Sequence, residues 1–182
     1  EAVKVALIRD RQFFEWLEAN AAALQACEPD ATSYMIRRCA ELHMRQIAHG
    51  GDPFERGSAR PLDYGHWSAH KLEALTQHEL RHGEAVAIGL ALDARYSVQV
   101  GMLAAGDEDR VHALLKRLGF HLWHPALESR DADGQWQLLR GLQEFPGAFA
   151  SSSVTRYIVD AAPPFRGFST ISAFQSRAMA WM

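Results

Sequence analysis

The chain has 182 residues, of which 48% are hydrophobic and 23% charged, with a formal net charge of −3. This length supports one domain with a hydrophobic core, or two very small ones, and the composition is that of an ordinary globular protein. The weak negative charge gives no electrostatic footprint for nucleic acid or for an anionic membrane surface, and no apolar run approaches the roughly 18 residues that span a bilayer.

Most of the predicted elements are helices. Asp10 is a good N-cap for a helix over residues 11–26, where aromatic and aliphatic side chains recur. The Pro29-Asp30 pair breaks this pattern, and a second amphipathic helix is predicted over residues 32–48. Residues 49–65 contain four glycines and two prolines, which predicts a loop with room for a short hairpin.

Three further helices are predicted in the second half. The first starts near His66 and stops before residue 79. The second covers residues 83–103 and is so apolar that we expect it at the centre of the fold. The third begins at Gly106-Asp107 and is closed by Gly119.

We therefore expect an all-α domain over residues 1–145. Its last element is a short amphipathic piece over residues 138–145, and no alternating pattern before residue 150 predicts a strand. Residues 146–182 lack a clear period, and we interpret them as an irregular tail of unknown structure. The chain begins at Glu1 without methionine or leader, which we interpret as part of a longer protein. Cys27 and Cys39 lack CxxC spacing, and we expect reduced, buried thiols in a cytoplasmic protein.

The stretch GHWSAHKLEALTQHELRHGEAV, residues 65–86, contains four histidines and three glutamates. Two interpretations compete, a solvated helix face and a metal site. His66 and His82 each lie beside a glycine, where a loop meets a predicted helix. Two helix starts of this kind can line a pocket with imidazole groups. All histidines except His66, His70 and His82 are interpreted as structural: His43, His49, His78, His112, His121 and His124.

Zinc needs three or four nitrogen, oxygen or sulfur donors, and a catalytic site keeps one position open. His66 and His82 could supply two donors, while spacing alone also allows His66 with His70. A carboxylate must complete the set, and the spacing does not identify it. The residues by themselves leave both interpretations open.

Four segments together resemble the 3-dehydroquinate synthase family of sugar phosphate cyclases. GHWSAHKLE, followed by LRHGEAVAIGLALDARYS, is similar to that family's GHTxGHAIE and HGEAVAxGM. The opening EAVKVALIRDRQFFEWLE resembles AEVIKxGLIxDxxFFxWLE, and DPFERGSARPLDYGH resembles DExExGLRxxLNxGH. The resemblance covers residues 1 to about 120, in order and with near-constant spacing.

The resemblance implies a two-domain enzyme with an N-terminal α/β domain that binds NAD, absent from this chain, and the helical C-terminal domain seen here. The implied enzyme is a carbon–oxygen lyase acting on phosphates. It uses NAD and Zn²⁺ or Co²⁺ to eliminate phosphate from a seven-carbon sugar phosphate and to close the ring by an aldol step. This chain alone would then be inactive. The expected partner is the small sugar phosphate, without nucleic acid or membrane, and the enzyme could form a homodimer.

The resemblance also implies three groups of site residues. The metal ligands would be Glu1, His66 and His82. The catalytic group would be Lys4, Glu55 and His70. The substrate-binding group would be Arg45, Arg60 and Asp63. The residues that bind the cofactor NAD stay unknown.

Several departures from the family pattern bear on the substrate. Asp63 replaces an asparagine, Arg45 replaces a lysine, and Ala59 stands where the family has an arginine, with Arg60 one place later. No DKK-like motif follows residue 120. Since a carboxylated sugar phosphate needs several cations, the alternative within the family is a cyclase of a non-carboxylated heptulose phosphate, similar to valiolone synthase.

Two alternatives lie outside the family. A non-enzymatic zinc-stabilised helical module would need a fourth protein ligand and a closed site. A zinc hydrolase using His66 and His70 is disfavoured, because Trp67 stands where the HExxH motif needs glutamate.

Overall fold

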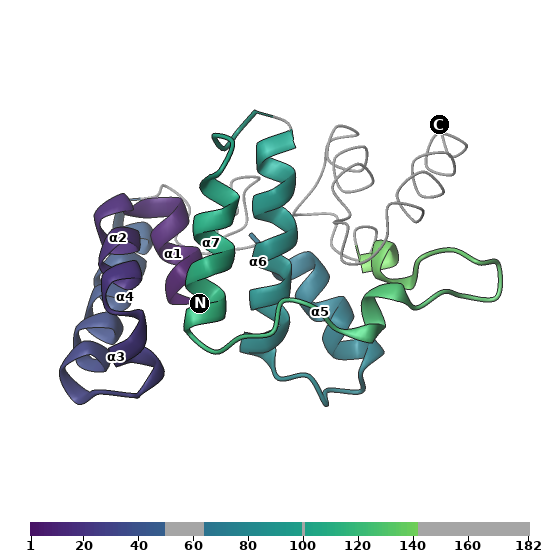
Figure 1. Ribbon diagram of the computed structural model, residues 1–182, viewed down its shortest axis with the longest axis horizontal. Coiled ribbons are helices and arrows are strands. Elements are labelled where there is room, and N and C mark those ends of the chain that lie inside the picture. The colour runs from purple at the N-terminus through teal and green to yellow at the C-terminus, as the bar shows by residue number, and fades with distance from the viewer. Residues whose placement is uncertain (50–63, 100, 142–182) are drawn as a thin grey trace.

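The computed structural model describes residues 1–49, 64–99 and 101–141 (Figure 1). These residues form α-helices and two 3₁₀ turns and contain no strand, only an isolated bridge between Arg130 and Trp136. The all-α prediction is confirmed. Among the described residues, no helix is both long enough and apolar enough to cross a membrane.

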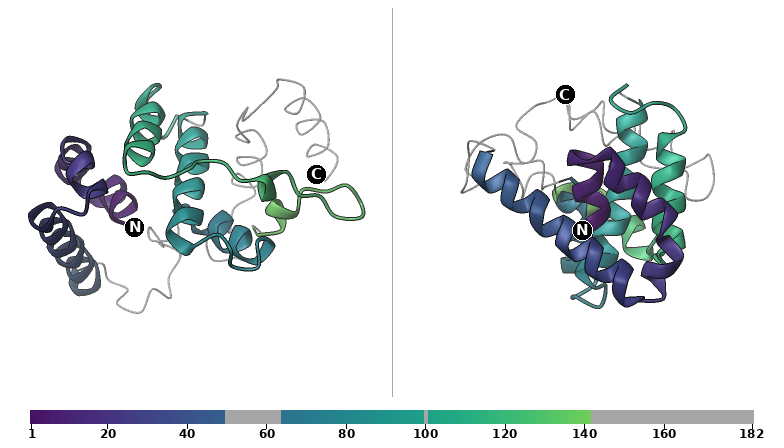
Figure 2. Two further views of the ribbon diagram at one scale, coloured as in Figure 1. Left: turned by 60° about the horizontal axis from the view of Figure 1, so that its bottom comes forward. Right: turned by 90° about the vertical axis from the view of Figure 1, so that its left-hand side faces the viewer.

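The first helical group is built from α1 (Ala2–Arg9), α2 (Arg11–Ala19), α3 (Ala21–Gln25) and α4 (Pro29–His49). The long helix α4 runs along one side of the molecule and packs against α1 and α3 (Figures 1 and 2). Asp10 separates α1 from α2, and its carboxylate accepts a hydrogen bond from the Phe13 backbone N–H at 3.0 Å. The predicted N-cap at Asp10 is confirmed.

Two predicted boundaries in this group are wrong. The helix expected over residues 11–26 is interrupted at Asn20, whose side-chain amide donates to the Trp16 carbonyl at 2.8 Å and so competes with the helical pattern. The next helix starts at Pro29 rather than at residue 32. Proline suits the first helical turn, where its missing N–H would have no partner anyway.

The second group contains α5 (His66–Leu75), α6 (His82–Gln99) and α7 (Asp107–Arg117), followed by the 3₁₀ turns η2 (Pro125–Glu128) and η3 (Gln137–Leu139). Helix α6 lies between α5 and α7 and packs against both (Figure 1). Its buried residues surround the axis: Ala85, Val86, Ala87, Ile88, Gly89, Leu90, Ala91, Leu92, Asp93, Ala94, Tyr96 and Ser97. The prediction that this helix is central is confirmed.

The ends of these helices follow local backbone signals. Helix α6 ends at Gln99, four residues before the predicted end, and the chain turns with Gly101 at φ 74°. Helix α7 is bounded by Gly106 and Gly119, both at positive φ, as predicted. Its first turn is acidic and its last turn basic, which complements the helix dipole.

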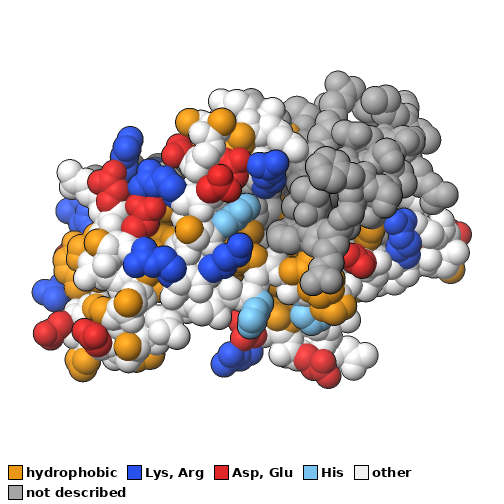
Figure 3. Space-filling model, viewed as in Figure 1, with side chains coloured by type: hydrophobic (Ala, Val, Ile, Leu, Met, Phe, Trp, Pro, Cys, Tyr) orange, Lys and Arg blue, Asp and Glu red, His pale blue; other side chains and the backbone are white. Residues whose placement is uncertain are grey.

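The two groups share one core and are also joined by ion pairs. Val3 and Ala6 of α1 belong to the same cluster of buried side chains as Trp67 of α5 and Leu114 of α7. Arg110 of α7 binds the Glu18 carboxylate of α2 at 2.6 Å. On the face drawn in Figure 3, acidic and basic side chains are interspersed over the coloured part of the molecule.

Other predictions fall partly outside the described residues. The loop 49–65 is described only at its ends, and the tail 146–182 is not described. Of the predicted piece 138–145, the first residues belong to η3 and its continuation, and the rest lies outside the described part. The expectation of buried thiols is wrong: Cys27 is exposed at the turn after α3, and Cys39 is only partly covered on α4.

Candidate metal centre

The starts of α5 and α6 are held together by a close approach of their backbones. Gly65 precedes α5 with φ 77°, and a Cβ placed there would lie 2.9 Å from the Leu90 nitrogen. A Cβ at Gly89 would lie only 2.0 Å from the Gly65 carbonyl oxygen. Neither position tolerates a side chain without movement of the backbone. The two helices therefore approach more closely than side chains would allow.

A buried carboxylate fixes the start of α5 on α6. Asp93 accepts one hydrogen bond from the Gly65 backbone N–H at 2.6 Å and another from the Trp67 indole N–H at 2.9 Å. Burial raises the pKa of Asp93 to about 6, against the opposing effect of these two hydrogen bonds. Because Gly65 and Trp67 flank His66, Asp93 determines where this histidine begins the helix.

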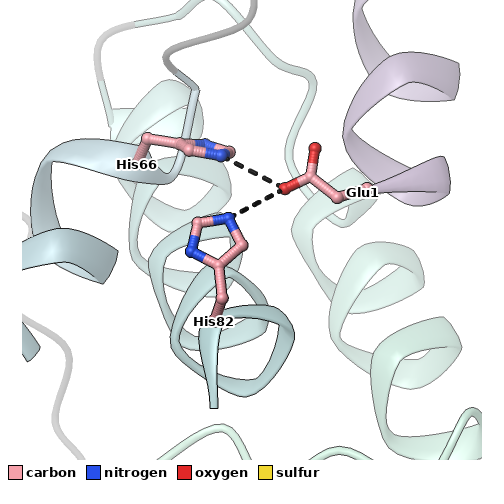
Figure 4. A group of neighbouring side chains, drawn as sticks. All are labelled: Glu1, His66 and His82. Atoms are coloured by element: carbon pink, nitrogen blue, oxygen red, sulfur yellow. Dashed lines mark ion pairs between the residues drawn. The ribbon is translucent and has the colours of Figure 1, made fainter. Parts of the chain in front are cut away.

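Glu1, His66 and His82 converge at the point where α1, α5 and α6 begin (Figure 4). The Glu1 carboxylate oxygen Oε1 lies 3.1 Å from His66 Nε2 and 3.5 Å from His82 Nε2. One ligand atom from each residue lies within 4.8 Å of the others. Two imidazole nitrogens and a carboxylate oxygen form a donor set that suits a divalent ion such as zinc.

The second ring nitrogen of each histidine has an oxygen acceptor. His66 Nδ1 lies 3.1 Å from the Tyr64 carbonyl oxygen. His82 Nδ1 lies 3.2 Å from both carboxylate oxygens of Glu73. When a metal ion binds Nε2, the nitrogen that faces Glu1, these acceptors hold the ring proton on Nδ1. Metal-binding histidines are commonly oriented in this way.

Lys4 adds a buried positive charge beside the cluster. Its side chain is 5% exposed, and its Nζ lies 2.7 Å from Glu1 Oε2 and 3.5 Å from His66 Nε2. The hydrogen bond from His66, with the Lys4 ammonium adding to it, holds the pKa of Glu1 well below its usual range despite partial burial. Glu1 therefore stays ionised, as a metal ligand must be.

His70 lies one turn after His66 on α5, next to the same cluster. The ring centroids of His66, His70 and His82 are 5.3–5.6 Å apart in each pair. His70 Nδ1 lies 3.1 Å from Glu73 Oε2, so His70, Glu73 and His82 form a second group with metal-ligand spacing. Desolvation raises the pKa of Glu73, but the hydrogen bonds and charges of His82 and His70 outweigh it and lower the pKa below its usual value.

The other predicted site residues are not part of this cluster in the described structure. Arg45 is exposed near the end of α4, and within residues 1–49, 64–99 and 101–141 no hydrogen bond or ion pair joins it to the cluster. The predicted Glu55, Arg60 and Asp63 lie outside the described residues. Their roles, like those of the clustered residues, stay predictions.

Sequence reasoning did not single out Glu73 and Asp93. Both lie inside the quoted motifs, GHWSAHKLE and GLALDARYS. Glu73 could have been found by spacing, because it follows His66 by seven residues and His70 by three, on the same helix face. Asp93 gives a weaker signal, a single carboxylate within an apolar helical segment that is then expected to be buried with partners.

A comparison with protein-family models matches residues 1–139 of the chain to 3-dehydroquinate synthase C-terminal. The match includes every helix described above and all three residues of the Glu1–His66–His82 cluster. It covers well over half of the 182 residues. The chain therefore belongs to the 3-dehydroquinate synthase C-terminal domain family.

Proposed function

We propose that this chain is the metal-binding catalytic part of a 3-dehydroquinate synthase-like sugar phosphate cyclase. The observation that carries the proposal is the convergence of Glu1, His66 and His82, with both Nε2 atoms facing one carboxylate oxygen. Residues 1–145 would form this part, and NAD would be bound mainly by an N-terminal domain of the parent enzyme. The reaction is a phosphate elimination followed by aldol cyclisation of a seven-carbon sugar phosphate.

The proposed division of labour follows from the environment of each side chain. A bound Zn²⁺ or Co²⁺ ion would polarise hydroxyl and carbonyl oxygens of the sugar. Lys4, whose ammonium is largely withdrawn from solvent, would bind an anionic oxygen of the substrate. The His70 side chain is 42% exposed and can reach solvent, so it suits proton exchange with a substrate hydroxyl. Glu55, Arg45 and Arg60 complete the proposed substrate contacts.

Two features support a catalytic site over a zinc-stabilised structural module. Within the described residues the Glu1 cluster offers three protein donors, whereas a closed structural site uses four. The side chains of Glu1 and His82 are also 52% and 44% exposed, so a substrate oxygen can approach. The hydrolase alternative lacks support, since His66 pairs with Glu1 and His82 rather than with an HExxH glutamate.

Two sugars are candidates for the substrate within the family. A heptulosonate phosphate carries a carboxylate that Asp63 would repel, whereas a heptulose phosphate without it offers hydroxyl groups to that side chain. We propose the carboxylated substrate, because the matched ligand and lysine motifs fit the synthase. The experiment that decides between them compares the turnover of each sugar by the parent enzyme, supplied with NAD and zinc. Turnover of the non-carboxylated sugar alone would replace the synthase assignment by the valiolone synthase-like one.

The metal site is tested by competition titration of the chain with zinc. Glu1→Gln, His66→Ala and His82→Ala should each weaken zinc binding by more than about 100-fold, beyond the usual cost of changing an outer partner of a ligand. His43→Ala on the exposed surface of α4 is the matched control and should bind zinc like the wild type. Equal affinity of all four variants would refute the metal site.

A further inference from the structure

We propose that Glu73 is a positioning residue that holds two histidines at once, the proposed metal ligand His82 and the proposed proton-exchanging His70. This inference rests on the proposed function and deepens it, because it connects the metal centre to the histidine that would act on the substrate. None of the roles assigned above to this site includes Glu73.

The carboxylate of Glu73 lies between the two rings. Its oxygens Oε1 and Oε2 are each 3.2 Å from His82 Nδ1, and Oε2 is 3.1 Å from His70 Nδ1. The Glu73 side chain is only 14% exposed, whereas the side chains of His70 and His82 are 42% and 44% exposed. The acceptor Glu73 is thus the most buried of the three residues, and the two imidazoles are more exposed to solvent.

The chemistry of a carboxylate determines what it does to the rings. An ionised carboxylate only accepts hydrogen bonds, so both histidines must present a protonated Nδ1 to Glu73. In a neutral imidazole this leaves the lone pair on Nε2. For His82 that atom faces Glu1, and for His70 it becomes the atom that can take a proton. One carboxylate therefore selects the tautomer of both rings.

Glu73 also restrains the rings in space. His82 is the first residue of α6 and belongs to a different element from Glu73, which lies in the last turns of α5. The Glu73–His82 contact therefore fastens the first residue of α6 to α5, beyond the backbone contact at Gly65 and Gly89. A partly exposed histidine at a helix end would otherwise sample several rotamers, and each would remove Nε2 from the metal position.

The arrangement has one competing interpretation. His70, Glu73 and His82 have metal-ligand spacing themselves, so Glu73 could bind an ion directly through the Nδ1 side of the rings. We favour the positioning role, because the Nε2 atoms of His66 and His82 already converge on Glu1, and because both His66 and His82 then have an oxygen acceptor on Nδ1. The two interpretations predict different variants to lose metal.

The experiment compares Glu73→Ala, Glu73→Gln and Glu73→Asp with the control Glu28→Gln, an exposed residue before α4. Zinc affinity is measured by competition titration, and the tautomers of His70 and His82 are read from imidazole ¹⁵N shifts of the metal-free chain. Glu73→Ala should keep a single bound ion but weaken its affinity about 10- to 100-fold. In the same variant, the Nδ1–H tautomer of both rings should be replaced by a mixture of the Nδ1–H and Nε2–H tautomers. Glu73→Gln, which keeps one acceptor oxygen, should be less affected, and Glu28→Gln unchanged.

Three outcomes overturn the inference. Unchanged affinity and unchanged tautomers in Glu73→Ala would show that Glu73 does not hold the rings, with the metal site left intact. Loss of zinc in Glu73→Ala together with retention in Glu1→Gln and His66→Ala would make Glu73 a direct ligand. Loss of the circular-dichroism melting transition in all three Glu73 variants would assign it to folding alone. Failure of the proposed function is distinct: the wild type itself would then bind no zinc, while the tautomer shifts would still report on Glu73.

Discussion

The helices within each of the two groups are held together by a different kind of contact. Between α5 and α6 the contact is made by backbone, at Gly65 and Gly89, and by the buried carboxylate of Asp93. Between the start of α2 and α4 it is made by side chains, such as the partly buried Asp10–Arg38 ion pair and the Trp16–Tyr34 rings, whose centroids are 4.3 Å apart.

The difference corresponds to what each group contributes to the candidate site. The α5–α6 pair supplies two imidazoles whose nitrogens must be positioned to a fraction of an ångström, and a backbone contact allows little adjustment. Helix α4 instead leaves large apolar side chains exposed, among them Ile36 and Met44. Glu1 comes from the first group and the histidines from the second, so a bound metal would join the two groups.

The largest effect is expected from a substitution at the backbone contact. In Gly89→Ala the new Cβ would lie 2.0 Å from the Gly65 carbonyl oxygen, so α5 must move away. We expect a loss of about 3 kcal/mol in the free energy of unfolding, at the upper end of overpacking effects, and a loss of zinc affinity. Urea denaturation and zinc titration measure the two.

Gly83→Ala on the same helix is the matched control. A Cβ there meets no atom within 4 Å, so alanine should stabilise α6 by about 0.5 kcal/mol or more through its higher helix propensity. If both alanine variants change the free energy of unfolding and the zinc affinity alike, the close approach of α5 and α6 does not stabilise the second group of helices.

A smaller effect is expected at Asp93. Asp93→Asn replaces one acceptor by an N–H group that faces a donor, either the Gly65 backbone or the Trp67 indole. The expected loss in the free energy of unfolding at pH 7 is about 1–3 kcal/mol, the cost of a buried polar group without a partner. Asp133→Asn, an exposed carboxylate in the loop before η3, should change stability by less than about 0.5 kcal/mol.

The pH dependence sharpens this test. Because burial raises the pKa of Asp93 to about 6, the native state binds more protons than the unfolded state between the ordinary aspartate pKa and pH 6. The contribution of Asp93 to stability therefore decreases as pH rises through this window. The stability difference between wild type and Asp93→Asn should shrink from pH 4 to pH 6, and a difference that grows would contradict the assigned shift.

The smallest effect is expected at the partly buried Asp10–Arg38 ion pair of the first group. The Arg38 guanidinium holds the pKa of Asp10 below its usual value, so the contribution of Asp10 is complete at neutral pH and is lost as pH falls through the native pKa. Asp10→Asn keeps a capping oxygen for Phe13 but removes the ion pair, and should cost about 0.5–1 kcal/mol at pH 7. Urea denaturation at pH 7 and pH 3 should show a smaller cost in acid, opposite in direction to the trend for Asp93.

Local patterns predicted much of this protein. Apolar periodicity and the signals at Asp10, Gly106 and Gly119 were enough for an all-α domain and for most helix ends, because those features depend on residues within a few positions of each other. The motifs around His66 and His82 were enough for the family, which the match over residues 1–139 shows. Where prediction failed, at Asn20 and Pro29, one side chain decided the local backbone against the general pattern.

Only the tertiary structure decided how the histidines are oriented. The contacts of Asp93 with Gly65 and Trp67 span 28 and 26 positions of the chain, and the approach of Lys4 to His66 spans 62. No periodicity encodes such pairs, because they depend on how α1, α5 and α6 pack once formed. The sequence alone could therefore name a histidine-rich motif, whereas the choice of Nε2 as the atom facing Glu1 follows from where packing sets the Tyr64 carbonyl and the Glu73 carboxylate.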